Sequence, residues 1–87
     1  MTNTQSPDQP EANPYRPRTR PTRADLIRVG DVVLESYEYP ATVTSAHQVG
    51  ANGRVNLRCR YIWQRPAEPD WSLGKFAPAT PILKAVK

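Results

Sequence analysis

Alternate arginines in one ten-residue stretch are the side chains of this chain best suited to binding chemistry. Apolar and polar residues alternate along RVNLRCRYIW, residues 54–63. In a β-strand, alternate side chains share a face and lie about 7 Å apart, close to the spacing of backbone phosphates. We therefore predict that Arg54, Arg58 and Arg60 form a stripe that binds an anionic macromolecule, with nucleic acid as the leading candidate. Arg65, in the loop that follows, would extend this stripe.

The stripe also has a second interpretation, as a solvated face whose arginines pair loosely with nearby carboxylates. A third interpretation is a protein interface, because an outward apolar residue beside arginines is typical of such surfaces. The alternative function is accordingly a protein–protein interaction module that docks on a host protein or lies within a larger assembly. Its contact residues would be Trp71, Ile62 and Tyr37.

Six aromatic residues lie in the predicted strands and their loops: Tyr37, Tyr39, Tyr61, Trp63, Trp71 and Phe76. Several of them are expected at one end of the fold. Exposed rings there would form a stacking platform for bases or a cage for a peptide side chain. A small core needs bulk, so we expect Tyr61, Trp63 and Phe76 to be mainly structural and Trp71 to be exposed.

The first 23 residues contain prolines every three or four positions and almost no apolar side chains. Such a segment cannot offset its ordering entropy by burial, which predicts a disordered or polyproline-II arm. The arm would add phosphate contacts through Arg16, Arg18 and Arg20. The sequence RPR at residues 16–18 resembles a minor-groove hook, PYRP at residues 14–17 fits a minimal PxxP ligand, and a solubilising tail is the third interpretation.

Residues for catalysis or metal binding are sparse. Cys59 is in phase with Leu57 and is expected to be a buried core thiol, and His47 is expected to be solvated at a strand end. Asp31 and Glu35 share the outward face of a predicted strand but lie about 13 Å apart along it, too far for a paired acid and base. We therefore expect no enzyme, no cofactor and no metal site.

Composition sets further limits. The chain has 87 residues, a net charge of +4 and one cysteine. A lone cysteine forms no internal disulfide, and the first residues lack a secretory signal pattern, so we expect a cytoplasmic protein. No apolar run approaches the roughly 20 residues that span a bilayer, so no membrane association is expected.

The alternation of apolar residues predicts five strands, at about residues 31–36, 39–47, 54–63, 72–76 and 81–86. A two-residue turn between the second and third strands would oppose inward and outward residues, so we predict a five-residue loop, 49–53. That register pairs inward residues as Val43–Cys59, Ala41–Tyr61 and Tyr39–Trp63. It pairs outward residues as Thr44–Arg58 and Thr42–Arg60.

These elements predict an all-β domain at residues 24–87, a strongly bent antiparallel meander closing to a barrel, after the arm at residues 1–23. VGDVV at residues 29–33, a long central hairpin and a short last strand resemble an SH3-like small barrel of the KOW or Tudor type. The arginine-rich style also resembles small bacteriophage proteins from GC-rich hosts. The oligomeric state stays open, with a homodimer through an unpaired sheet edge as one expectation.

Overall fold

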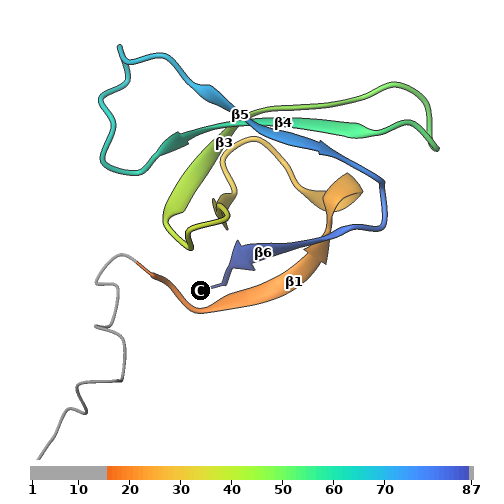
Figure 1. The fold of residues 1–87 in the computed structure, drawn as a ribbon, viewed down its shortest axis with the longest axis horizontal. Helices are drawn as coiled ribbons and strands as arrows, with labels where there is room; N and C mark the ends of the chain where they lie inside the picture. Colours follow the sequence, from red (N-terminus) through yellow and green to blue (C-terminus); the bar gives the residue numbers. More distant parts are fainter. Residues whose placement is uncertain (1–15, 87) are drawn as a thin grey trace, which may run out of the picture.

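The computed structural model describes residues 16–86, which form one antiparallel sheet and no α-helix (Figure 1). The six strands are β1 (Thr19–Arg23), β2 (Val32–Leu34), β3 (Pro40–Gln48), β4 (Val55–Tyr61), β5 (Trp71–Phe76) and β6 (Pro81–Ala85). A single 3-10 turn, Ala24–Leu26, follows β1. The all-β prediction is confirmed, and the predicted count of five strands is wrong by one.

The sheet has the order β1-β6-β2-β3-β4-β5 and bends so that β1 and β6 lie across from β3, β4 and β5 (Figure 1). The predicted closure into a barrel does not occur. To close the sheet, its two end strands, β1 and β5, would have to pair with each other, and within the described residues β1 pairs with β6 alone and β5 with β4 alone. Strands β1 and β5 are therefore the two open ends of the sheet.

The last five residues of the predicted arm, Thr19–Arg23, form strand β1 of the sheet, so the prediction of an arm without regular structure is wrong for them. All five residues pair with β6, and the carbonyl of Arg18 accepts a hydrogen bond from the amide of Val86 at 2.9 Å. Backbone pairing needs no apolar face, and proline is tolerated at Pro21 because β1 is an edge strand. Residues 1–15 of the predicted arm lie outside the described residues.

The register of the central hairpin is confirmed over its first half and shifted in its second. Val43 lies opposite Cys59, Ala41 opposite Tyr61 and Thr42 opposite Arg60, as predicted. A β-bulge at Thr44 then moves the pairing by one residue, so that Ser45 opposes Arg58. The predicted Thr44–Arg58 pair is therefore wrong, and the connection is residues 49–54, since β3 ends at Gln48 and β4 begins at Val55.

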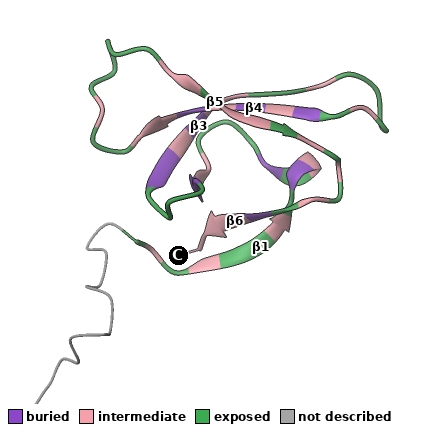
Figure 2. Ribbon diagram, in the orientation of Figure 1, coloured by how far each residue is buried: buried purple, intermediate pink, exposed green. Residues whose placement is uncertain are grey.

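The core is the concave side of this bent sheet (Figure 2). Every second residue of β4 from Val55 to Cys59 is buried, while Asn56, Arg58 and Arg60 are half-buried on the outer side. This confirms the alternation on which the strand was predicted. The buried apolar set is Ala24, Ile27, Val33, Leu34, Ala41, Val43, Val55, Leu57, Cys59 and Ile82.

Candidate nucleic-acid interface and an aromatic groove

The predicted arginine stripe is divided by an ion pair on the outer side of β4. Arg58 donates from Nε and Nη2 to Asp70 Oδ1 at 3.1 and 3.0 Å, and again from Nη2 to the Asp70 carbonyl at 3.0 Å. The Thr44 hydroxyl donates to Asp70 Oδ2 at 2.6 Å. These contacts hold the Arg58 guanidinium in a fixed orientation and compensate its charge, so Arg58 is a brace between β4 and the start of β5.

The hydroxyl of Thr44 first, and the guanidinium of Arg58 second, lower the pKa of Asp70 below its usual range. Asp70 therefore carries a full negative charge at neutral pH. Arg60 adds to this effect by its charge, which places it near the same carboxylate. Two other carboxylates pair with cations outside the stripe: Asp31 with Lys84 at 3.7 Å and Glu38 with Arg16 at 3.1 Å.

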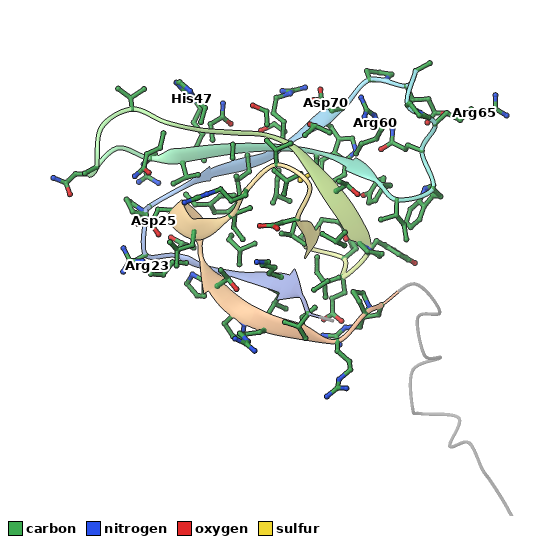
Figure 3. The ribbon with its side chains drawn as sticks, turned by 180° about the vertical axis from the view of Figure 1, so that it is seen from behind. Arg23, Asp25, His47, Arg60, Arg65 and Asp70 are labelled. Carbon is green, nitrogen blue, oxygen red and sulfur yellow. The ribbon has the colours of Figure 1, made fainter. Side chains whose placement is uncertain are left out.

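Unlike Arg58, neither Arg60 nor Arg65 forms an ion pair with a carboxylate of residues 16–86. Arg60 donates from Nε to the carbonyl of Glu68 at 2.9 Å, a contact that fixes the side chain without neutralising it. Arg65 is exposed in the loop between β4 and β5, with no side-chain hydrogen bond to any of residues 16–86. Figure 3 shows Arg60 beside Asp70, whereas Arg65 projects from the outer part of the loop between β4 and β5, which lies at one end of the β3–β5 layer.

The other predicted arginines are not gathered at that end. Arg54 precedes β4 and lies about 20 Å from Arg60 along the strand at roughly 3.3 Å per residue. Arg16 pairs with Glu38 at 3.1 Å, and Arg20 lies in β1 opposite Lys84. Arg18 immediately precedes β1, in the layer across from the stripe.

Four aromatic rings form a continuous row beside this arginine end. Trp63 stacks on Tyr61 with centroids 4.7 Å apart and an interplanar angle of 7°. The edge of Tyr39 meets Trp63 at 5.7 Å, and Trp71 packs on the other side of Tyr61 at 4.7 Å. The expected Tyr39–Trp63 neighbours therefore meet through their rings, outside the paired part of β3 and β4.

The exposure of the two tryptophans is the reverse of the prediction. Trp71 is half-buried against the core, and its indole N–H donates to Gln64 Oε1 at 2.8 Å. Trp63 is 48% exposed because β4 ends at Tyr61, so Trp63 lies in the following turn. Two residues predicted for a protein interface, Ile62 and Tyr37, are exposed at 47% and 78%.

Glu35 is a candidate binding residue whose side chain was predicted on the wrong face of its strand. It was expected on an outward face, yet it is only 9% exposed. Val33, two residues earlier and on the same face of the strand, is fully buried opposite the buried Ala41, so the inward face of this strand is one residue out of phase with the prediction. Its Oε1 accepts the amides of Tyr37 and Tyr39 at 2.7 and 2.9 Å, and its Oε2 accepts the Tyr61 hydroxyl at 2.9 Å. Val32, Val33 and Leu34 are all apolar, so alternation does not determine which face of this strand is buried.

Glu35 opens onto a groove of about 450 Å³ between β5 and β6. Leu34, Glu35, Ser36, Tyr61, Trp71, Ser72, Leu73, Phe76, Pro81, Ile82 and Leu83 line it. Burial first, and the hydrogen bond to Glu35 second, raise the pKa of Tyr61, which keeps its hydroxyl a donor at neutral pH. The groove and the arginine end share Tyr61, which contributes to both.

The residues weighed for catalysis stay apart. His47 is exposed on β3, distant from Asp70 in Figure 3, and Cys59 is fully buried. Residues 16–86 hold no group of three or more His, Cys, Asp or Glu side chains arranged to bind a metal ion. Within the same residues, no helix is long and apolar enough to cross a membrane.

The site described above therefore consists of an arginine end (Arg60 and Arg65), an aromatic row (Tyr39, Trp63, Tyr61 and Trp71) and a groove with a buried carboxylate. Its chemistry is that of binding surfaces on a small sheet. No family model, no curated protein and no solved structure matches the chain, so these residues and their geometry are the basis for any functional assignment.

Proposed function

We propose that the protein is a non-catalytic module that binds single-stranded nucleic acid at the arginine end. Trp63 and Tyr39 would stack on bases, and Arg60 and Arg65 would contact the backbone phosphates. The bent antiparallel sheet is compatible with the resemblance to SH3-like small barrels, which we retain as part of the proposal.

The proposal depends on Trp63, which stacks on Tyr61 and is about half exposed. In the sequence it lies between Arg60 and Arg65, two arginines that form no ion pair with a carboxylate of residues 16–86. Its ring lies flat on Tyr61, so it is held in one orientation, and 48% of it is open to solvent. Arg60 and Arg65 lie three residues before and two residues after it. Proteins that bind single-stranded nucleic acid without strict sequence preference commonly combine exposed aromatic rings with nearby cations.

Single strands fit this surface better than a duplex. Stacking on Trp63 and Tyr39 requires bases whose faces are free, and in a duplex those faces are covered by neighbouring base pairs. Arg58, the middle arginine of the predicted stripe, is held by Asp70 and is left out of the proposed contact set. The surface therefore has few phosphate contacts, which predicts modest affinity and a shallow dependence on salt.

The test is a titration of the full chain with fluorescently labelled single-stranded and double-stranded oligonucleotides between about 50 and 200 mM salt. The double variant Arg60→Gln/Arg65→Gln removes two phosphate contacts and should reduce the slope of log K against log salt by about 1.4. Trp63→Ala should weaken single-strand binding by about 1–3 kcal/mol for each base that stacks on the ring.

A matched control is Arg18→Gln/Arg20→Gln, which changes the net charge equally but alters the opposite layer of the sheet. This variant should bind almost as the natural protein does. If both double variants lose the same affinity, binding depends on total charge and the proposed surface is wrong. Tighter binding to the duplex than to the single strand would also contradict it.

A further inference from the structure

A second site lies on the other side of Tyr61, in the groove between β5 and β6. Its volume of about 450 Å³ falls in the range of sites that hold a ligand side chain or small molecule. Three aromatic side chains line it, Tyr61, Trp71 and Phe76, and no lysine or arginine does. The groove is therefore apolar and aromatic, with one acidic residue, Glu35, in its wall.

The carboxylate of Glu35 has no counter-ion among residues 16–86. Its three hydrogen-bond donors are the amides of Tyr37 and Tyr39 and the hydroxyl of Tyr61, all of them neutral groups. No lysine or arginine of residues 16–86 forms an ion pair with it. Buried carboxylates are ordinarily paired with a cation or a metal, so this one favours a positively charged guest.

Strand β5, which borders the groove, has one edge that pairs with no strand of the described residues. β5 pairs with β4 on one side and with no strand of the described chain on the other. Trp71 and Phe76 lie opposite the buried Cys59 and Val55, so they face the concave side of the sheet. An extended segment added along β5 would place every second side chain on that same side, over the groove.

We propose that this groove binds an extended segment of a partner protein that pairs with β5 and inserts an arginine side chain toward Glu35. Arginine suits the site better than lysine because its planar guanidinium stacks on aromatic rings and can at the same time donate to Glu35 Oε2, the carboxylate oxygen that accepts one hydrogen bond where Oε1 accepts two. Backbone pairing along β5 supplies affinity, and the arginine supplies selectivity. The groove adjoins the arginine end at Tyr61, so one module would bind two ligands of opposite charge at neighbouring surfaces.

The test uses the acetylated and amidated peptide GTVRVTG and a second peptide in which citrulline replaces the arginine. Citrulline keeps the shape of the side chain and removes its charge. NMR titration of the ¹⁵N-labelled full chain should show shifts at the Trp71 indole and at β5 amides. The arginine peptide should bind at least about tenfold more tightly than the citrulline peptide, as expected for loss of a charge-assisted pair and its cation–π contact.

The variant Glu35→Gln should remove most of that preference, so that both peptides bind alike. Glutamine keeps an oxygen acceptor for the amides of Tyr37 and Tyr39, and the comparison of the two peptides on the natural protein needs no variant. Equal binding of the two peptides, no binding of the arginine peptide, or shifts confined to β3 would each overturn the proposal. So would concentration-dependent shifts of the same signals without peptide, which would assign the edge to a second copy of the chain.

Discussion

The two sides of the sheet at β4 each carry a carboxylate, and the two carboxylates have different partners. On the outer face Asp70 holds Arg58, and the two charges cancel within a partly solvated network that includes Thr44. On the inner side Glu35 accepts three neutral donors and has no ion pair within residues 16–86. The number of arginines on a face is therefore a poor guide to where ligands bind. The balance of charge around each carboxylate is a better one.

The largest expected difference between the faces is the reactivity of Cys59, which lies between Arg58 and Arg60 in sequence but on the inner face. Burial, and to a smaller degree the charge of Asp70, raises its pKa to about 12. At pH 8 only about one thiol in ten thousand would be ionised, and the thiolate is the reactive form. We expect almost no reaction with a disulfide reagent at pH 8 in the folded protein.

The same reaction in denaturant supplies the control, because there Cys59 should react completely and fast. Rapid labelling of the folded chain at pH 8, under conditions that keep it folded by circular dichroism, would show that the inner face is open to water. The two faces would then not differ as described.

The next largest effect is the removal of the inner carboxylate. Glu35→Ala leaves two amides and the Tyr61 hydroxyl without their acceptor in a buried place. We expect the free energy of unfolding in urea to fall by about 2–4 kcal/mol, since unsatisfied buried donors cost about 1–3 kcal/mol each and the site can relax in part. Glu35→Gln should lose much less, because it keeps an acceptor. Equal losses for alanine and glutamine would contradict the hydrogen-bonded turn.

A smaller loss is expected on the outer face from Thr44→Val, which keeps the shape of the side chain and deletes the hydroxyl. Its hydrogen bond to Asp70 should be worth about 1 kcal/mol in urea unfolding. Thr42→Val, on the same strand and without a side-chain bond to Asp70, is the matched control. A loss as large in the control would mean that β-branching and solvation, and not the Asp70 contact, determine the result.

Thr44 also marks the boundary of what the sequence predicts. Alternation of apolar residues identifies β4 and its buried face, and matching of faces gives the pairing from Ala41–Tyr61 to Val43–Cys59. The bulge that follows places Thr44 against Asp70, a residue 26 positions away, and no local pattern encodes such a contact. The periodicity of apolar residues therefore cannot predict the register of the hairpin after Val43.

Two further errors, in β1 and at Glu35, have related causes. β1 is stabilised by backbone pairing with β6 and has no apolar face of its own, so a criterion based on burial misses it. Glu35 shares its face with the buried Val33, and the apolar run Val32–Leu34 does not reveal which face of β2 is buried. Alternation predicts the buried face of β4 well, but it fails in β2, where three apolar residues follow one another.

The smallest expected effect is the pH dependence of the outer pair. The Thr44 hydroxyl and the Arg58 guanidinium lower the pKa of Asp70 in the folded protein. A lowered folded pKa means that the ionised form stabilises the fold, fully so above the unfolded value near about 4, and that this contribution is lost as the pH falls through the folded pKa. Asp70→Asn should therefore be less stable than the natural protein at pH 7, and the difference should shrink below about pH 4.

Asp25 provides the comparison that isolates this effect, because Arg23 lowers its pKa in the same direction on another part of the surface (Figure 3). Asp25→Asn should keep the part of the acid response that belongs to Asp70, and the double variant should lose both parts additively, since the two pairs share no residue. If the stability difference caused by Asp70→Asn were constant from pH 7 to pH 3, the carboxylate charge would contribute nothing. Arg58 would then be held in place by the carbonyl of Asp70 alone.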